Sequence, residues 1–249
     1  INLKPNDKVL IEMVDSYCEP LVNELVRQIY ELGGLPFVDI QNSRIQRELI
    51  INCTDEQMDF HVKSKKSFYK NLDAIIHIRS QENSEEFCDI PPEKIMLFSK
   101  KYIEIRNIAV TKKWTYLIYP NSSLAQSAKM SLKGFEDFYF NVSTLDYQKM
   151  SLAMDDLVSL MEKTNKVKIV GRNTDLTFSI ENMKVVKCDG KMNIPDGEVF
   201  TAPFKESING KITYNVPSSY HGFTFNDICF EFKDGKIVDA SANDSIRLN

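Results

Sequence analysis

Short apolar runs alternate with longer segments of helical periodicity through the first half of this chain. Four runs have strand length and are rich in β-branched residues: 8–14, 35–40, 74–78 and 114–119. Between the first two, apolar residues recur at helical spacing from Leu21 until Gly33 and Gly34 end the helix. Four strands separated by helices favour an α/β fold with a mainly parallel, doubly wound sheet.

The connections between these strands carry helix-start signals. Ser43 can cap a helix that begins at Arg44, and Pro91 with Pro92 can open the helix before the fourth strand. The first strand-to-helix connection, residues 15–19, contains no glycine, so the phosphate-cradling G-x-G-x-x-G loop is missing there. The sequence therefore predicts a doubly wound sheet without a dinucleotide site.

After Asn165 the pattern changes to short alternating strands. They cover residues 166–170, 176–180, 211–216, 228–232 and 236–240. Asp234-Gly235 and Asn209-Gly210 are both dipeptides typical of two-residue hairpin turns. We therefore place a domain boundary near residue 165, with an α/β domain over 1–165 and a β-rich segment over 166–249.

Charge and hydropathy limit the partners. The 31 basic and 35 acidic residues are mixed along the chain, and the dense basic patch at 63–66 reads as the solvated face of a helix, so nucleic acid is not expected. No apolar run approaches the roughly 20 residues that span a bilayer, and residues 1–5 lack the layout of a signal peptide. We expect no membrane partner.

The cysteines favour a reducing compartment. There are five, an odd number, with no C-x-x-C pair among them. They predict neither a disulfide framework nor a zinc knuckle, and reduced thiols in a cytoplasmic protein fit them best.

One turn carries a candidate metal ligand. Residues 193–203 read Asn-Ile-Pro-Asp-Gly-Glu-Val-Phe-Thr-Ala-Pro, so a Pro-Asp-Gly turn delivers Glu198 to the start of a short β-prone run. A carboxylate held where a tight turn meets a strand can act as a metal ligand or a base. Surface turns also carry Asp, Gly and Glu routinely. From these residues alone, the interpretation of Glu198 as an ordinary turn residue therefore stays open.

This stretch resembles the signature of the thermophilic-type metalloaminopeptidases, the family of aminopeptidases T and S. Residues 114–120 with Leu124-Ala-Gln126 resemble a strand and helix of that family, and residues 171–177 resemble its G-T-D-L-T element. Residues 209–242 resemble its next hairpins. The similarity is collinear from Asp7 to the C-terminus, and its specific motifs lie in 171–242.

The resemblance implies a homodimeric, cytoplasmic exopeptidase that removes N-terminal residues from peptides. It implies two divalent metal ions, zinc, cobalt or manganese, held by two glutamates, histidines and an aspartate. Glu198 matches the first glutamate ligand. Two close cations lower the pKa of a bridging water and polarise the scissile carbonyl, which suits peptide hydrolysis.

The resemblance also implies that the remaining ligands follow Asn249, so we expect a truncated portion of the enzyme that is inactive by itself. The catalytic residues are then unknown within these 249. His61, His77 and His221 share no ligand spacing with one another or with Glu198, and a structural or solvent-exposed role is favoured for each.

Two other interpretations stay open. In one, the chain is a complete, non-catalytic relative that serves as a binding or dimerisation module. In the other, it is related to mononuclear-iron ring-opening dioxygenases, whose fold the family's fold resembles.

Overall fold

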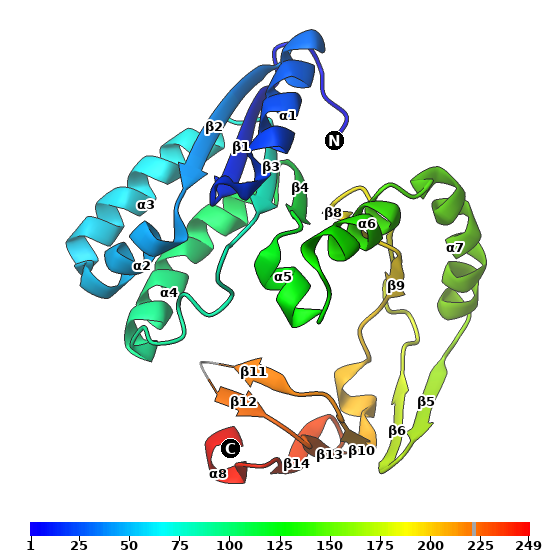
Figure 1. Ribbon diagram of the computed structural model, residues 1–249. Helices are drawn as coiled ribbons and strands as arrows, with labels where there is room; N and C mark the ends of the chain where they lie inside the picture. Colours follow the sequence, from blue (N-terminus) through cyan, green and yellow to red (C-terminus); the bar gives the residue numbers. More distant parts are fainter. Residues whose placement is uncertain (221–222) are drawn as a thin grey trace. The chain divides into compact units, whose positions relative to one another are not determined.

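A computed structural model describes residues 1–220 and 223–249. The chain divides into two compact units (Figure 1). Unit 1 contains Ile1–Leu145 and Gly190–Asp196, and unit 2 contains Asp146–Asp189 and Gly197–Asn249. These units follow from contacts within the chain. The domain boundary near residue 165, placed where the β-rich pattern begins, stays a prediction.

Unit 1 is built on a parallel sheet with the strand order β2-β1-β3-β4-β8. The expected strands are confirmed as β1 (Lys8–Val14), β2 (Leu35–Gln41), β3 (Ala74–Arg79) and β4 (Lys113–Ile118). The fifth strand, β8 (Asn193–Ile194), comes from far along the sequence and pairs in parallel with β4 at Tyr116 and Leu117. The mixed α/β class with a mainly parallel sheet is therefore confirmed.

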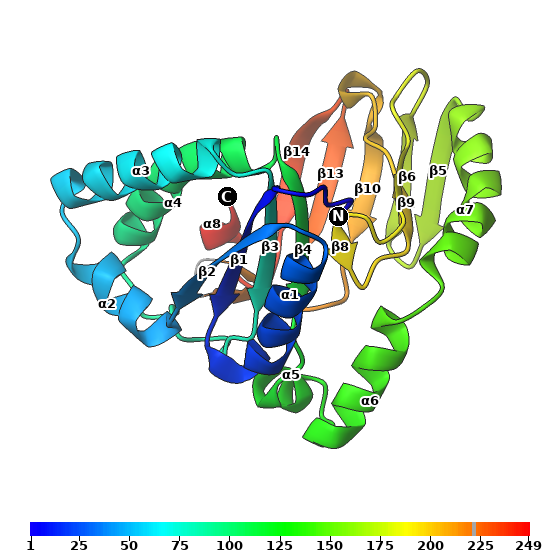
Figure 2. The same ribbon diagram turned by 90° about the horizontal axis from the view of Figure 1, so that it is seen from above.

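Helices cover both faces of this sheet (Figure 2). On one face, α1 (Glu19–Glu31) packs Val22 and Ile29 against alternate residues of β1, beginning with Val9 and Ile11. On the other face, α3 (Asp55–Lys70) and α4 (Pro92–Ala109) pack against Leu10 and Ile75. Side chains alternate between the faces of a strand, so Glu12 shares the face of Leu10.

The remaining helices of unit 1 connect these layers. They are the 3-10 turn η1 (Ser16–Cys18), α2 (Ser43–Asn52), α5 (Ser122–Ser127) and α6 (Leu132–Ser143). The predicted cap of α2 is wrong by one residue. The Asn42 side chain accepts from the Ile45 amide at 3.1 Å, whereas the Ser43 hydroxyl donates to buried Asp15 at 2.7 Å.

Unit 2 contains α7 (Tyr147–Glu162) and an antiparallel sheet with the order β14-β13-β10-β6-β5. Those strands are β5 (Lys166–Gly171), β6 (Thr174–Ser179), β10 (Asn209–Thr213), β13 (Cys229–Lys233) and β14 (Lys236–Ser241). Shorter elements are β7 (Val186–Cys188), β9 (Glu198–Phe200), η2 (Lys205–Ser207), β11 (Ser218–Tyr220), β12 (Phe223–Phe225) and α8 (Ser245–Leu248).

One of the two predicted hairpin turns is present. Asp234 and Gly235 both have positive φ, 48° and 76°, and they join β13 to β14, as a two-residue turn requires. The predicted turn at Asn209-Gly210 is wrong, because both residues lie inside β10. Gly210 sits there because a Cβ atom would lie 2.1 Å from the carbonyl oxygen of Asp175 on neighbouring β6.

Within the part of the chain that the structure describes, no helix is long and apolar enough to cross a membrane. All five cysteines are free thiols, and Cys18, Cys53 and Cys229 are buried.

Candidate functional site

The predicted metal-ligand turn connects β8 to β9. The chain leaves β8 at Ile194, turns through Pro195, Asp196 and Gly197, and enters β9 at Glu198. Gly197 has a φ of +145°, and a Cβ atom there would lie 3.3 Å from the sulfur of Met150 on α7. The backbone conformation therefore favours a glycine beside the candidate ligand, and a Cβ atom would in addition crowd the flexible Met150 side chain.

Glu198 projects away from α7. Strand β9 pairs with β7, with Val199 opposite Lys187 and Glu198 opposite Cys188. The Lys187 ammonium contacts α7, donating to the Ser151 carbonyl at 3.1 Å and to the Asp155 carboxylate at 2.5 Å. Paired residues share a face and neighbours alternate, so Glu198 lies on the opposite face. Its side chain is exposed.

The described residues do not complete a metal site around this carboxylate. Among residues 1–220 and 223–249, no three His, Cys, Asp or Glu side chains come close enough together to hold a metal ion. An exposed carboxylate suits one position in the coordination shell of a divalent ion, which needs about four or more donors.

The two described histidines are in unit 1 and have partners there. His61 on α3 lies with Nε2 2.6 Å from the Tyr102 hydroxyl, and His77 on β3 lies with Nδ1 2.6 Å from Oε2 of Glu12. His221, the third histidine weighed from the sequence, lies outside the described residues.

A group of five interacting polar side chains also lies in unit 1. Asp39, Glu12 and His77 form one row across β2, β1 and β3, because they are register partners. Lys65 and Tyr69, one helical turn apart on α3, reach down to this row. The Lys65 ammonium lies 3.0 Å from Oδ2 of Asp39 and 3.8 Å from Oε1 of Glu12, and the Tyr69 hydroxyl donates to Glu12. We call these five residues the Glu12 network.

Burial and pairing oppose each other in setting the charges of this network. Burial would raise the pKa of Glu12, but the hydrogen bonds from His77 and Tyr69, with the nearby positive charge, hold that pKa below its usual value. Burial would lower the pKa of Lys65, and the adjacent Asp39 and Glu12 carboxylates raise it instead. Burial and the carboxylate of Glu12 raise the pKa of Tyr69. The network therefore holds a carboxylate and an ammonium in their charged forms.

Sequence reasoning missed this network. One signal was present, since Glu12 interrupts an otherwise apolar run of strand length, and a charge in the middle of a buried strand needs partners. The basic patch at 63–66 was interpreted as a solvated helix face, but the Lys65 side chain is only 21% exposed and belongs to the network.

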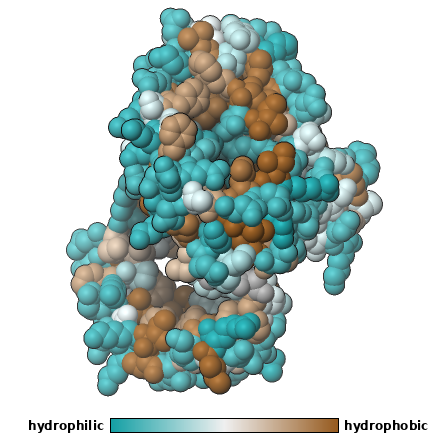
Figure 3. Space-filling model, turned by 90° about the vertical axis from the view of Figure 1, so that its left-hand side faces the viewer, coloured by the Kyte–Doolittle hydropathy of each residue, from teal (hydrophilic) through white to brown (hydrophobic). Residues whose placement is uncertain are grey.

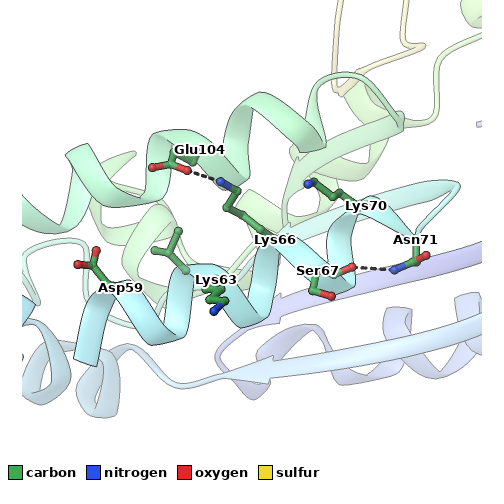
Figure 4. A pocket seen from close by; sticks show the side chains of 8 residues that line it. Asp59, Lys63, Lys66, Ser67, Lys70, Asn71 and Glu104 are labelled. Carbon is green, nitrogen blue, oxygen red and sulfur yellow. Dashed lines mark hydrogen bonds and ion pairs between the residues drawn. The ribbon is translucent and has the colours of Figure 1, made fainter. Parts of the chain in front are cut away.

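A surface hollow of about 570 Å³ lies on the outer side of α3 and α4 (Figure 4). Lys63, Lys66 and Lys70 line it together with Asp59 and Glu104. Lys66 pairs with Glu104, and Asp59 pairs with Lys101. This hollow is a surface groove in which charges of both signs already meet.

Residues 1–246 match the family model described as thermophilic metalloprotease (M29). The chain belongs to this family. The M29 assignment confirms the resemblance drawn from the 193–203 turn and from the motifs in 171–242. Membership in a metalloprotease family also implies the use of divalent metal.

Curated relatives of this M29 chain are aminopeptidases. Aminopeptidase PepS of Streptococcus thermophilus is 23% identical over 280 residues, covering 98% of this chain and 67% of PepS. Aminopeptidase AmpS of Bacillus subtilis (strain 168) is 21% identical over 259 residues, covering 89% of this chain and 62% of AmpS. The chain thus spans about two thirds of the length of these relatives.

A solved structure shares the fold. Wild-type AmpT from Thermus thermophilus superposes with a TM-score of 0.82 at 18% identity, covering 99% of this chain and 69% of AmpT. At this identity the likeness supports the α/β fold with its parallel and antiparallel sheets.

Proposed function

We propose that this M29 protein is a metal-dependent aminopeptidase that removes N-terminal residues from peptides, and that Glu198 is one ligand of its metal site. The position of Glu198 carries the proposal. It starts β9 directly after a glycine turn, on the face turned away from α7, and its side chain is exposed.

The surroundings of Glu198 support a ligand role. No hydrogen bond or ion pair of its carboxylate occurs among the described residues, so both oxygens remain available for a cation. When bound, two divalent ions would activate a water and polarise the substrate carbonyl. We propose zinc, cobalt or manganese as the metal, and we propose that the other ligands come from residues outside the described part of this chain.

We also propose that the working form is a cytoplasmic homodimer, as the family resemblance implies. Light scattering of the purified protein tests the dimer, and cell fractionation tests the compartment.

The test of Glu198 is the Glu198→Gln variant in the protein as its gene encodes it. The amide keeps the side-chain shape and removes the charge that offsets the cations. We expect metal content by elemental analysis to fall and hydrolysis of leucine p-nitroanilide to fall at least about a hundredfold, since even outer-shell substitutions cost about 10- to 100-fold.

Glu181→Gln is the matched control, because Glu181 is an exposed glutamate of the same unit, and it should leave both measurements unchanged. Far-ultraviolet circular dichroism should be the same for both variants. Unchanged metal content and turnover in Glu198→Gln would show that Glu198 is a plain turn residue.

A further inference from the structure

A cavity of about 450 Å³ opens in unit 1 where β2 ends and α2, α3 and α4 meet. Its volume falls within the roughly 300–1,000 Å³ of small-molecule pockets. All of its lining belongs to unit 1, and none of it belongs to the turn that carries Glu198.

The walls of the cavity are apolar. Ile45 and Leu49 line it from α2, Phe60 from α3 and Phe98 from α4. The Phe98 ring stacks on Tyr102 with 4.2 Å between ring centroids, so the α4 wall is a paired aromatic surface. Figure 3 views the side of unit 1 that carries α2 and α3, and apolar side chains gather there in patches among polar ones.

One end of the cavity is charged. Asp39 and Lys65 of the Glu12 network both line it. Oδ2 of Asp39 accepts two hydrogen bonds, each 3.0 Å long, from Lys65 and from the Gln41 amide. Among the described residues no hydrogen bond reaches Oδ1 of Asp39, and the side chain is 35% exposed. A carboxylate oxygen is therefore available to a ligand beside apolar walls.

The charge balance selects the sign of that ligand. The single ammonium of Lys65 already lies between two carboxylates, 3.0 Å from Asp39 and 3.8 Å from Glu12. His61 also lines the cavity, but its Nε2 already lies 2.6 Å from the Tyr102 hydroxyl. An incoming anion would therefore find no unpaired cation among the described lining residues and would approach two negative groups. An incoming ammonium would meet Oδ1 of Asp39, and the faces of aromatic rings also attract cations.

We propose that this cavity binds a small primary amine with an aromatic body, its ammonium donating to Asp39 and its ring lying against Leu49, Phe60 and Phe98. The site is separate from metal binding by Glu198, so either assignment can fail without the other. The groove of Figure 4 offers no equivalent, because the carboxylates that line it already pair with lysines.

Isothermal titration calorimetry with three ligands of matched size tests the charge preference. They are 2-phenylethylamine, its neutral analogue 2-phenylethanol, and its anionic analogue phenylacetate. We expect the amine to bind at least tenfold more tightly than phenylacetate, with the alcohol between them. Equal affinity for the amine and the acid, or no binding of the amine, would overturn the proposal.

Two variants locate the site. Asp39→Asn should weaken amine binding at least tenfold and leave the alcohol unchanged. Leu49→Trp should fill the cavity from a residue that is 53% exposed and abolish binding of both ligands without touching the ion pairs. Leu32→Trp is the control, since Leu32 is 59% exposed at the end of α1, on the opposite face of the sheet.

Leu49→Trp keeps the test decisive if Asp39→Asn fails to fold. Amine binding that survives Leu49→Trp would overturn the proposal. A second result would also overturn it: no amine binding to the parent protein, together with a change of oligomeric state in Leu49→Trp seen by light scattering. The apolar walls would then be a protein contact surface.

Discussion

Nδ1 of His77 lies 2.6 Å from Oε2 of Glu12, and the Glu12 side chain is only 5% exposed within a parallel sheet. A charge in that position is stabilised by its partners alone, because the preceding side chains on the same face of β1 and β3, Leu10 and Ile75, are apolar. The Glu12 network is therefore a point at which a single substitution has a large and specific effect.

Glu12→Gln should lower the free energy of unfolding by about 2–4 kcal/mol. The amide removes the charge that Lys65 and His77 face and leaves a buried polar group with poorly matched partners. Urea unfolding followed by circular dichroism measures the effect. Glu31→Gln, in an exposed pair with Arg27, is the control and should change the midpoint little. Equal midpoints for the two variants would contradict this account.

Acid should destabilise unit 1 through the same carboxylate. The pKa of Glu12 in the folded protein is below the ordinary value of about 4.3. At a pH between the folded and unfolded pKa values of Glu12, the unfolded chain binds a proton at this carboxylate more readily than the folded chain does. The stabilisation is thus fully present above about pH 4.3 and is lost as the pH falls through the lowered pKa. Urea midpoints from pH 6 to pH 3 should fall less steeply in Glu12→Gln than in the parent, and parallel curves would contradict the prediction.

Gly210→Ala should destabilise the antiparallel sheet by more than about 2 kcal/mol. The new methyl group would lie 2.1 Å from the Asp175 carbonyl oxygen, and the residue has a φ of +108°. Gly171→Ala in the same sheet is the control, because its nearest neighbour would be the Cβ of Thr174 at 3.8 Å, an ordinary contact. Thermal unfolding of both variants measures the difference. Similar melting temperatures would contradict the prediction, because β10 and β6 would then move apart at little cost to admit the methyl group.

Asn42→Ala and Ser43→Ala should both be destabilising, for different reasons. Asn42→Ala removes the cap of α2 and should cost about 1 kcal/mol. Ser43→Ala removes a hydroxyl that donates to Asp15, a carboxylate that is 5% exposed, and should cost about 1–3 kcal/mol. Urea unfolding of the two single variants checks both values. No loss in Asn42→Ala would mean that Ser43 caps the helix after all.

The 249 residues by themselves should hydrolyse no leucine p-nitroanilide. Their described part brings one candidate carboxylate, Glu198, to a metal site that needs several donors. Turnover is measured after incubation with zinc, cobalt or manganese. Hydrolysis that a chelator abolishes would show that the chain assembles a working site from its own residues.

Local patterns predicted most of the parallel sheet. The four long strands of unit 1 are apolar runs between helices of ordinary spacing, so periodicity identified them to within a residue or two. Strand β8 escaped because a two-residue strand has no periodicity, and its pairing with Tyr116 is a long-range contact. The predicted turn at Asn209-Gly210 was wrong for a related reason. The same dipeptide occurs in hairpin turns and in strands where a glycine lets a neighbouring backbone come close, and only long-range contacts distinguish the two.

The same distinction between local patterns and long-range contacts applies to the candidate sites. Glu198 was identified because a turn motif with a family resemblance is contiguous in sequence, whereas its ligand role stays a prediction. The Glu12 network joins residues from four elements, and only the folded chain brings Asp39, Lys65 and His77 together.

Strand β8 has a consequence for how the chain is made. The ribosome must synthesise residues 146–189, which belong to unit 2, before the last strand of the unit 1 sheet. Until then the outer edge of β4 has no strand partner, because the Tyr116 amide and the Thr115 hydroxyl both bond to the Met192 carbonyl, at 2.7 and 3.0 Å. A nascent chain stalled before residue 190 should thus expose an open sheet edge, and such an edge can pair with other chains until β8 covers it.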